Sequence, residues 1–261
     1  MRAACIVPIS ALPLIKDYSY YLALAHAALG NSTYASFYRT RSSSSFLILD
    51  NSVHELGTPL GLTLLRQAAV LTAPDLLVVP DSMWSTEETL ALARNFSLVV
   101  PDFLDTFSNL QFMVVPHGQD QKEYTQNLQD LLELPYPTYI GLGKVSSRLK
   151  LRVLLAKQAI AAGKRVHFLG VWKDPVAELL EGKELGGGVS GIDTSYVARL
   201  ALLGRTLLEP FPTPTILDLF AEEDTYNMDW LRSQLEAFRW LAEGPASTVG
   251  ELEQEYRNGR F

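Results

Sequence analysis

Polar residues that could carry out acid–base chemistry stand directly after several short apolar runs. Asp50 and Asn51 follow one such run, and Asp81 and Asp193 each close another. In parallel α/β folds the carboxyl ends of the strands meet at one rim, where functional residues gather. We therefore expect the three carboxylates to face one another. Unpaired acids crowded together repel each other, so a group of this kind is typical of a ligand or metal site.

Three kinds of chemistry could use these acids. Hard oxygen ligands suit a divalent metal ion. A pair of carboxylates suits glycosyl chemistry, in which one attacks an anomeric carbon and the other handles a proton. A third carboxylate matches the two adjacent hydrogen-bond donors on the edge of guanine. Composition alone does not choose among them.

The elements that must position these residues alternate along the chain. Continuous apolar runs predict buried strands at 3–9, 46–50, 76–81, 112–118, 139–144, 166–170 and 188–193. Stretches with helical spacing lie between them, and one opens with the capping pattern of Ser85 and Glu88. This alternation predicts a TIM-like (β/α)8 barrel, with an open doubly wound parallel sheet as the alternative. The segment 97–101 is the candidate for a weak eighth strand.

The length of the chain predicts one barrel domain over 1–261. Its last part, 206–261, is expected to form a helical extension behind the proline-rich connector 209–215. The extension contains an amphipathic helix, which should turn one apolar face to the body of the protein. That face consists of Trp230, Leu231, Leu235, Phe238 and Leu241.

Charge and composition exclude some classes of protein. The chain has 22 basic and 29 acidic residues, a net charge of −7, which argues against a general nucleic-acid coat but allows a local basic strip. Cys5 is the only cysteine, so neither an internal disulfide nor a cysteine-built zinc site can form. Pro8 and Pro13 interrupt the apolar opening, and no apolar run is long enough to cross a bilayer. We expect a cytoplasmic protein without a membrane partner.

Six short motifs follow one another between Phe46 and Arg199: LILDNS, VVPD with STEETLA, MVVPHG, IGLGK, HFLG and GIDTSYVAR. In this order they resemble the motif series of the tRNA-guanine transglycosylase superfamily, and most closely its short branch that inserts 7-deazaguanines into DNA. The resemblance implies a pentosyltransferase that exchanges guanine for a 7-deazaguanine through a covalent Asp–C1′ intermediate. It implies no cofactor and no metal.

The resemblance also implies a role for each matching residue. Asp193 takes the place of the nucleophile and Asp50 that of the proton-exchanging acid, supported by Asn51. The residues expected to contact the base are Asp81, His117, Gly118, Gly141, Leu142 and Gly143. The family has a glutamine where His117 stands, so this contact depends on the tautomer of the histidine.

The resemblance favours DNA over tRNA as the partner. The tRNA-acting members carry a zinc subdomain of three cysteines and a histidine, which this chain cannot build. Guanine and a 7-deazaguanine would be the small ligands, and a homodimer stays open. The basic residues expected at phosphates are Arg199, Lys144, Arg148 and Lys150, with Arg152 in the same cluster. A solvated helix face is the alternative for that cluster.

Other interpretations belong to different classes. The chain could be a non-catalytic nucleobase-binding or partner subunit, or a metal-dependent hydrolase that uses the same rim. His54 and Glu55 are expected to pack or cap, and His167 is expected to be a satisfied core histidine. Trp84 and Trp172 follow strand ends and could stack on a base or anchor loops.

Overall fold

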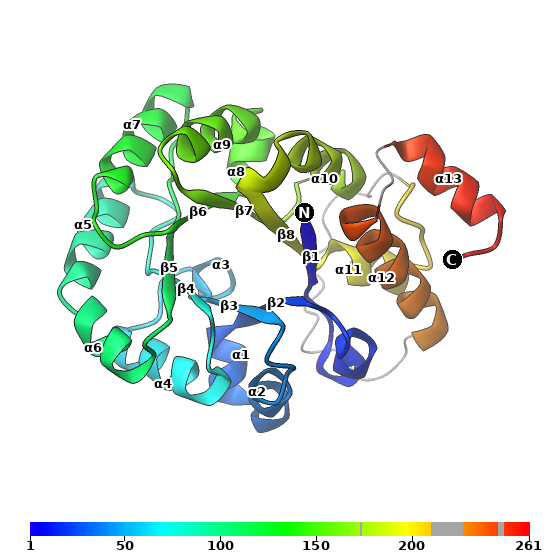
Figure 1. Cartoon of the computed structure of the whole chain (residues 1–261), viewed down its shortest axis with the longest axis horizontal. Helices are drawn as coiled ribbons and strands as arrows, with labels where there is room; N and C mark the ends of the chain where they lie inside the picture. Colours follow the sequence, from blue (N-terminus) through cyan, green and yellow to red (C-terminus); the bar gives the residue numbers. More distant parts are fainter. Residues whose placement is uncertain (173, 210–226, 245–247) are drawn as a thin grey trace.

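The computed structural model describes residues 1–172, 174–209, 227–244 and 248–261, and it shows a nearly closed (β/α)8 barrel (Figure 1). The predicted fold class is confirmed, and the alternative of an open doubly wound sheet is wrong. Eight strands form one sheet in the order β1-β8-β7-β6-β5-β4-β3-β2, and every pair is parallel. The strands are β1 (Arg2–Cys5), β2 (Tyr20–Leu24), β3 (Phe46–Asp50), β4 (Leu76–Val78), β5 (Gln111–Val114), β6 (Tyr139–Gly143), β7 (Arg165–Leu169) and β8 (Val189–Thr194).

Helices follow the strands and surround the ring (Figure 1). A 3-10 segment, η1 (Ile9–Ile15), joins β1 to β2, and a second, η2 (Gly186–Gly188), precedes β8. The α-helices up to β6 are α1 (Ala25–Gly30), α2 (Ser32–Arg39), α3 (Val53–Leu56), α4 (Leu62–Thr72), α5 (Thr86–Ser97), α6 (Val100–Thr106) and α7 (Gln121–Leu132). The later ones are α8 (Lys144–Arg148), α9 (Arg152–Ala161), α10 (Pro175–Glu184), α11 (Tyr196–Leu202), α12 (Met228–Glu243) and α13 (Val249–Arg257).

The eighth strand is not the one that the sequence suggested. The segment 97–101 contains the end of α5 and the start of α6, whereas β2 (Tyr20–Leu24) completes the sheet by pairing with β3. Alanine and leucine favour a helix in isolation, so the sequence pattern of β2 merges with that of the helix after it. Pairing and complete burial override that preference in the folded chain.

Aromatic rings fill the amino-terminal end of the barrel. Tyr20, Phe46 and Tyr139 are the first residues of their strands, and their rings lie 5.7 and 6.1 Å apart in succession. The guanidinium of Arg2 lies 4.2 Å from the centre of the Tyr20 ring. This end of the barrel is therefore packed solid, and the polar groups of the strand ends lie at the opposite rim.

The predicted apolar face of the terminal helix is largely confirmed. In α12 the side chains of Leu231, Leu235, Phe238 and Leu241 are buried, and Trp230 is partly buried. Figure 1 shows α12 on the outside of the ring beside α10 and α11, with α13 farther from the ring. The connector from 210 to 215 lies outside the described residues, and the division into one barrel and an extension stays a prediction.

Candidate active site

Three of the predicted acids come together at the carboxyl ends of the strands. Asp193 belongs to β8, Asp50 ends β3, and Asp81 follows β4. Because these strands are parallel members of one sheet, the three carboxyl groups lie at the same rim, and the charges of Asp193 and Asp81 add to the burial and the Glu55 charge that raise the pKa of Asp50. The expected convergence is therefore present in the structure.

Asp193 is held by two hydrogen-bond donors. Its Oδ1 lies 3.0 Å from Nε2 of His167 and accepts the backbone N–H of Gly170 at 3.1 Å. Gly170 has a φ of +69°, a left-handed conformation that suits glycine and aims this N–H at the carboxylate. Asp193 is 5% exposed and His167 is fully buried. His167 is thus a core histidine, as expected, but one that bonds a rim acid.

Asp81 forms a closed group with two neighbours. Its Oδ1 accepts from Nδ2 of Asn51 at 2.5 Å, and its Oδ2 lies 2.5 Å from Nε2 of His117. Asn51 also donates to the carbonyl of Val79 at 2.8 Å, and His117 donates its backbone N–H to Asn127. Both oxygens of Asp81 therefore bond within the protein, which leaves this acid poorly placed to read a base edge.

The pKa values of two carboxyl groups at the mouth are raised above their ordinary values. Burial, then the charge of Glu55, raise the pKa of Asp50 well above its ordinary value, although the Ser52 N–H donates to Asp50 at 2.7 Å. Desolvation also raises the pKa of Glu55. Ser52 has a φ of +64°, an uncommon conformation for a residue with a side chain, and it turns α3 back so that Glu55 follows Asp50 closely. Such a pair can hold and release a proton.

A cationic group lies beside these acids. Nζ of Lys144, the first residue of α8 after β6, lies 2.6 Å from Nε2 of His54 in α3. Desolvation lowers the pKa of Lys144, and Arg199 acts in the same direction, whereas Glu55 and Asp193 oppose them. Desolvation and Lys144 also lower the pKa of His54, to about 4. Both His54 and Glu55 are exposed to water at the mouth of the barrel.

The predicted glycine-rich contacts have mainly packing roles. A Cβ on Gly118 would lie 2.5 Å from the backbone nitrogen of Tyr124, so this glycine allows α7 to approach. A Cβ on Gly141 would lie 2.6 Å from Leu169 inside the barrel, whereas Gly143 faces open space. Leu142 is fully buried. Of the four positions, Gly143 alone borders open space.

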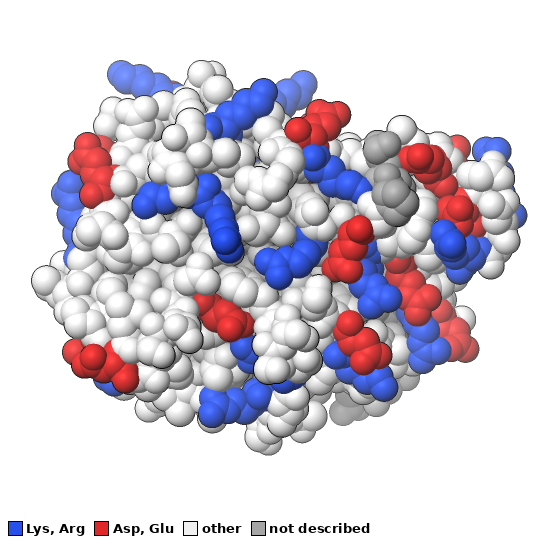
Figure 2. Space-filling model, in the orientation of Figure 1, with Lys and Arg blue, Asp and Glu red and all other residues white. Residues whose placement is uncertain are grey.

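The predicted basic cluster divides into separate places. Lys144 and Arg199 act on the same site, because both change the pKa values of His54 and Glu55. Arg148 and Lys150 are exposed on the surface, and Arg148 lies 5.6 Å from the centre of the Trp172 ring. Arg152 is not available to a phosphate, because it is 1% exposed and bonds Glu178 at 2.6 Å. Figure 2 shows basic side chains around the centre of one face and mixed charges over α12 and α13.

Several groups beside the rim acids were not among the predicted site residues. His54 and Glu55 were expected to pack or cap, yet they lie between Asp50 and Lys144. Their positions four and five residues after Asp50 were the available signal, since a short turn after a strand returns to the rim. Tyr20, which bonds His167 at 2.9 Å, was missed because its strand was missed. Trp84 is 77% exposed.

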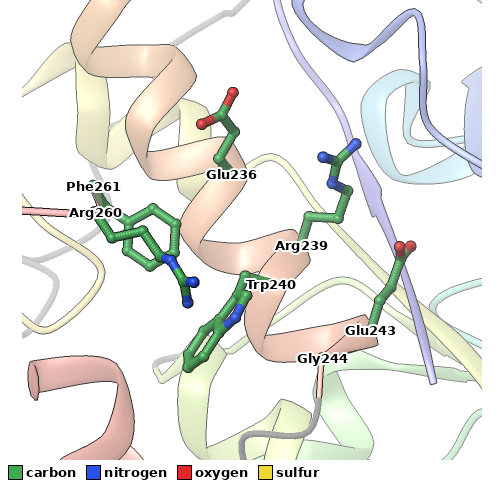
Figure 3. Close-up of a pocket in the computed structure, with 7 residues that line it drawn as sticks. All are labelled: Glu236, Arg239, Trp240, Glu243, Gly244, Arg260 and Phe261. Carbon is green, nitrogen blue, oxygen red and sulfur yellow. The ribbon is translucent and has the colours of Figure 1, made fainter. Parts of the chain in front are cut away.

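A separate hollow lies outside the ring, on α12 and the residues after α13 (Figure 3). Its volume is about 500 Å³, and it is lined by Glu236, Arg239, Trp240, Glu243, Gly244, Arg260 and Phe261. Phe261 packs on Trp240 with ring centres 5.9 Å apart, and Arg260 stacks over the same ring. None of the acids of the rim lines it, so we do not count this hollow as part of the active site.

In the described ranges, no three His, Cys, Asp or Glu side chains are grouped so that they could hold a metal ion. No helix in the same part of the chain has the length and apolar character needed to cross a membrane.

The chain resembles known proteins in its fold only. No protein-family model matches it, and no curated protein matches it in sequence. A HpcH/HpaI aldolase/citrate lyase family protein from Burkholderia cenocepacia superposes with a TM-score of 0.53 and 12% identity, over 77% of this chain and 90% of that one. A putative fructose-1,6-biphosphate aldolase from Coccidioides immitis gives 0.55 and 16%, over 97% and 91%. The carboxyl transferase domain of Rhizobium etli pyruvate carboxylase gives 0.51 and 15%, over 95% of this chain and 49% of that one.

These structures overturn the resemblance to the tRNA-guanine transglycosylase superfamily. The three superposed structures are an aldolase/citrate lyase family protein, a putative aldolase and a carboxyl transferase domain, and none of them is described as a transglycosylase. The prediction of a pentosyltransferase that exchanges guanine for a 7-deazaguanine in DNA or tRNA is therefore wrong, and so are its Asp193–C1′ intermediate and its nucleobase-binding alternative. The predicted partners, namely nucleic acid, free bases and a second copy of the chain, stay predictions.

The error has a physical reason. Every (β/α)8 barrel places turns and polar residues at its strand ends, because the functional rim lies there. Short motifs of the kind "apolar run, then aspartate" or "apolar run, then glycine" are therefore expected in barrels of different function. Their order therefore predicted the barrel and not the reaction.

Proposed function

We propose that the chain is an enzyme of carbonyl chemistry in which the amine of Lys144 forms an imine with an aldehyde or ketone. The observation that carries the proposal is the position of Lys144 at the end of β6, 2.6 Å from His54 and among Glu55, Asp193 and Arg199. The similar structures contribute the barrel alone.

A lysine must lose its proton before it can attack a carbonyl carbon, and its surroundings favour that loss. Desolvation and the neighbouring Arg199 both lower the pKa of Lys144. Desolvation and the charges of Lys144 and Arg199 lower the pKa of His54 to about 4, so this ring is neutral near pH 7 and its Nε2 accepts a hydrogen bond from Nζ. The amine is thus positioned by a neutral partner.

The acids supply the proton transfers that imine formation requires. Attack by Nζ gives a carbinolamine, whose hydroxyl leaves as water after it receives a proton. Glu55 is suited to give that proton because its pKa is raised. Burial and the charge of Glu55 raise the pKa of Asp50, so Asp50 can serve as a second proton donor. The resulting cationic imine lies in the field of Asp193, whose charge already acts on Nζ. A cationic imine draws electrons from the neighbouring carbon, which allows a C–H or C–C bond there to break.

Borohydride trapping tests the proposal. The protein is incubated with short aldehydes, ketones or 2-oxo acids and then treated with sodium borohydride, which reduces an imine to a stable amine. We expect one adduct, heavier than the protein by the mass of the carbonyl compound less one oxygen, on the peptide that contains Lys144. Lys144→Arg should abolish it, and Lys150→Arg, a matched change on the exposed surface nearby, should not. Equal labelling of the Lys144→Arg variant would refute the proposal.

A further inference from the structure

A buried chain of hydrogen bonds reaches Asp193 from within the barrel. The hydroxyl of Tyr20 lies 2.9 Å from Nδ1 of His167, and Nε2 of His167 lies 3.0 Å from Oδ1 of Asp193. Tyr20 and His167 are both fully buried. We propose that these two side chains are positioning residues, which hold Asp193 through its Oδ1 and leave its Oδ2 for a group that enters the mouth.

The chemistry of the groups favours one arrangement of protons. Gly170 donates its backbone N–H to the same Oδ1 at 3.1 Å, and a backbone amide can only donate. If Nε2 of His167 carries the proton, Oδ1 accepts twice and Nδ1 accepts from the hydroxyl of Tyr20. Burial raises the pKa of Tyr20, so this hydroxyl keeps its proton. The other tautomer would set a bare Nε2 against a carboxylate oxygen, two buried acceptors without a proton between them.

The side chain of Tyr20, which begins this chain of hydrogen bonds, fits only because a glycine lies beside it. A Cβ on Gly191, in β8, would collide with the ring of Tyr20 and lie 2.8 Å from the carbonyl of Arg2. The ring of Tyr20 is stacked on Phe46, and the guanidinium of Arg2 lies over it. The ring is therefore held from several sides, and its hydroxyl has little freedom to leave His167.

This arrangement orients Asp193 toward the substrate. Among the described residues, the hydrogen bonds to the Asp193 side chain all end on Oδ1. Oδ2 is thus the oxygen left to face a cation at Lys144, on which the charge of Asp193 acts. That role rests on the proposed imine function, whereas the arrangement of protons is a property of the resting protein.

Nitrogen NMR of the resting protein tests the arrangement of protons directly. In protein labelled with 15N-histidine, near neutral pH, we expect His167 to be a neutral imidazole with its proton on Nε2 and a hydrogen-bonded Nδ1. Its signals are assigned by their loss in His167→Gln, or by eliminating those of His26, His54 and His117 if that variant does not fold. A proton on Nδ1 alone, or a doubly protonated ring, would overturn the inference.

Rates of borohydride trapping at Lys144 test the positioning role. His167→Leu removes the donor to Asp193 and should slow trapping by about tenfold or more, the usual worth of a hydrogen bond to a charged group. His167→Gln returns an amide N–H to the place of Nε2 and should restore most of the rate. Tyr139→Phe is the control, because Tyr139 is equally buried and its hydroxyl bonds Arg165 instead.

The two proposals fail in different ways. Undiminished trapping in His167→Leu would overturn the positioning role while the imine function stands. If the wild-type protein forms no adduct and His167 still shows the expected tautomer, the imine function fails and the hydrogen-bond arrangement is supported.

Discussion

A buried ion pair supports the loop that holds Asp193. Nη1 of Arg152 lies 2.6 Å from Oε2 of Glu178, and Nη2 donates to the carbonyl of Gly170 at 3.1 Å. The other oxygen of Glu178 accepts the backbone N–H of Trp172 at 2.8 Å. Gly170 in turn donates to Asp193. Removing one partner of this pair should therefore affect both the stability of the protein and its site.

The magnitude follows from burial. Arg152 is 1% exposed and Glu178 is 6% exposed, so Glu178→Leu strands a guanidinium charge that water cannot reach. Breaking a pair of this kind costs about 3–5 kcal/mol of unfolding free energy. Arg152→Met combined with Glu178→Leu removes both charges and keeps the volume, so it should cost less than either single change. A residual loss of about 1 kcal/mol is expected for each backbone partner left behind.

Guanidinium unfolding of the wild type, both single variants and the double variant measures these costs. Glu253→Gln serves as the control, because the Glu253–Arg257 pair is exposed and should change stability by less than about 1 kcal/mol. Costs that simply add in the double variant would refute the reasoning, because they would mean that neither single change leaves a buried charge unpaired. A Glu178→Leu variant as stable as the wild type would do the same.

Two further predictions concern the acids and the glycines of the barrel. The pKa of Asp50 is raised in the fold, so its contribution to stability is present below its ordinary pKa of about 3.9 and is lost as the pH rises toward the folded value. Asp50→Asn keeps an acceptor for Ser52, so it should raise the unfolding free energy by about 1 kcal/mol or more at about pH 7 and by little at about pH 4. Unfolding curves at both pH values measure this gain, with the exposed Asp105→Asn variant as control. A gain that does not depend on pH would contradict the prediction. Gly141→Ala should lower the unfolding free energy by about 1–3 kcal/mol, because the added methyl group would press on Leu169. Gly143→Ala should lower it much less, because Gly143 faces open space. Equal thermal unfolding of the two variants would count against this packing.

Much of the fold could be predicted because buried parallel strands have a distinct sequence pattern. The predicted run 46–50 coincides with β3, and 139–144 exceeds β6 by one residue. β2 was missed because Leu22, Ala23 and Leu24 favour a helix and continue into the pattern of α1, whereas pairing with β3 makes this segment a strand. Local sequence shows the apolar pattern of a buried strand, but it does not show which other strand a segment will pair with.

The location of the site could be predicted from the sequence, but the hydrogen-bond partners of its residues could not. In any parallel barrel, acids at the carboxyl ends of the strands lie at one rim, and Asp50, Asp81 and Asp193 do so here. Which groups each acid bonds depends on side chains from neighbouring strands. Asn51 and His117 occupy both oxygens of Asp81, and sequence spacing gives no indication of this.

The difference between the two acids indicates where chemistry can occur. Both carboxylate oxygens of Asp81 form hydrogen bonds, one with Asn51 and one with His117, so this side chain links residues that follow the two strands on either side of β4. Asp193 receives both of its described hydrogen bonds on one oxygen, although it is nearly as buried. An acid whose second oxygen is left over can act on a substrate, and one that is fully bonded cannot do so without breaking the fold around it. The charge of Asp193 acts on Lys144, and the two residues come from β8 and from the end of β6, which is why we place the reaction on the side of the barrel formed by β6, β7 and β8.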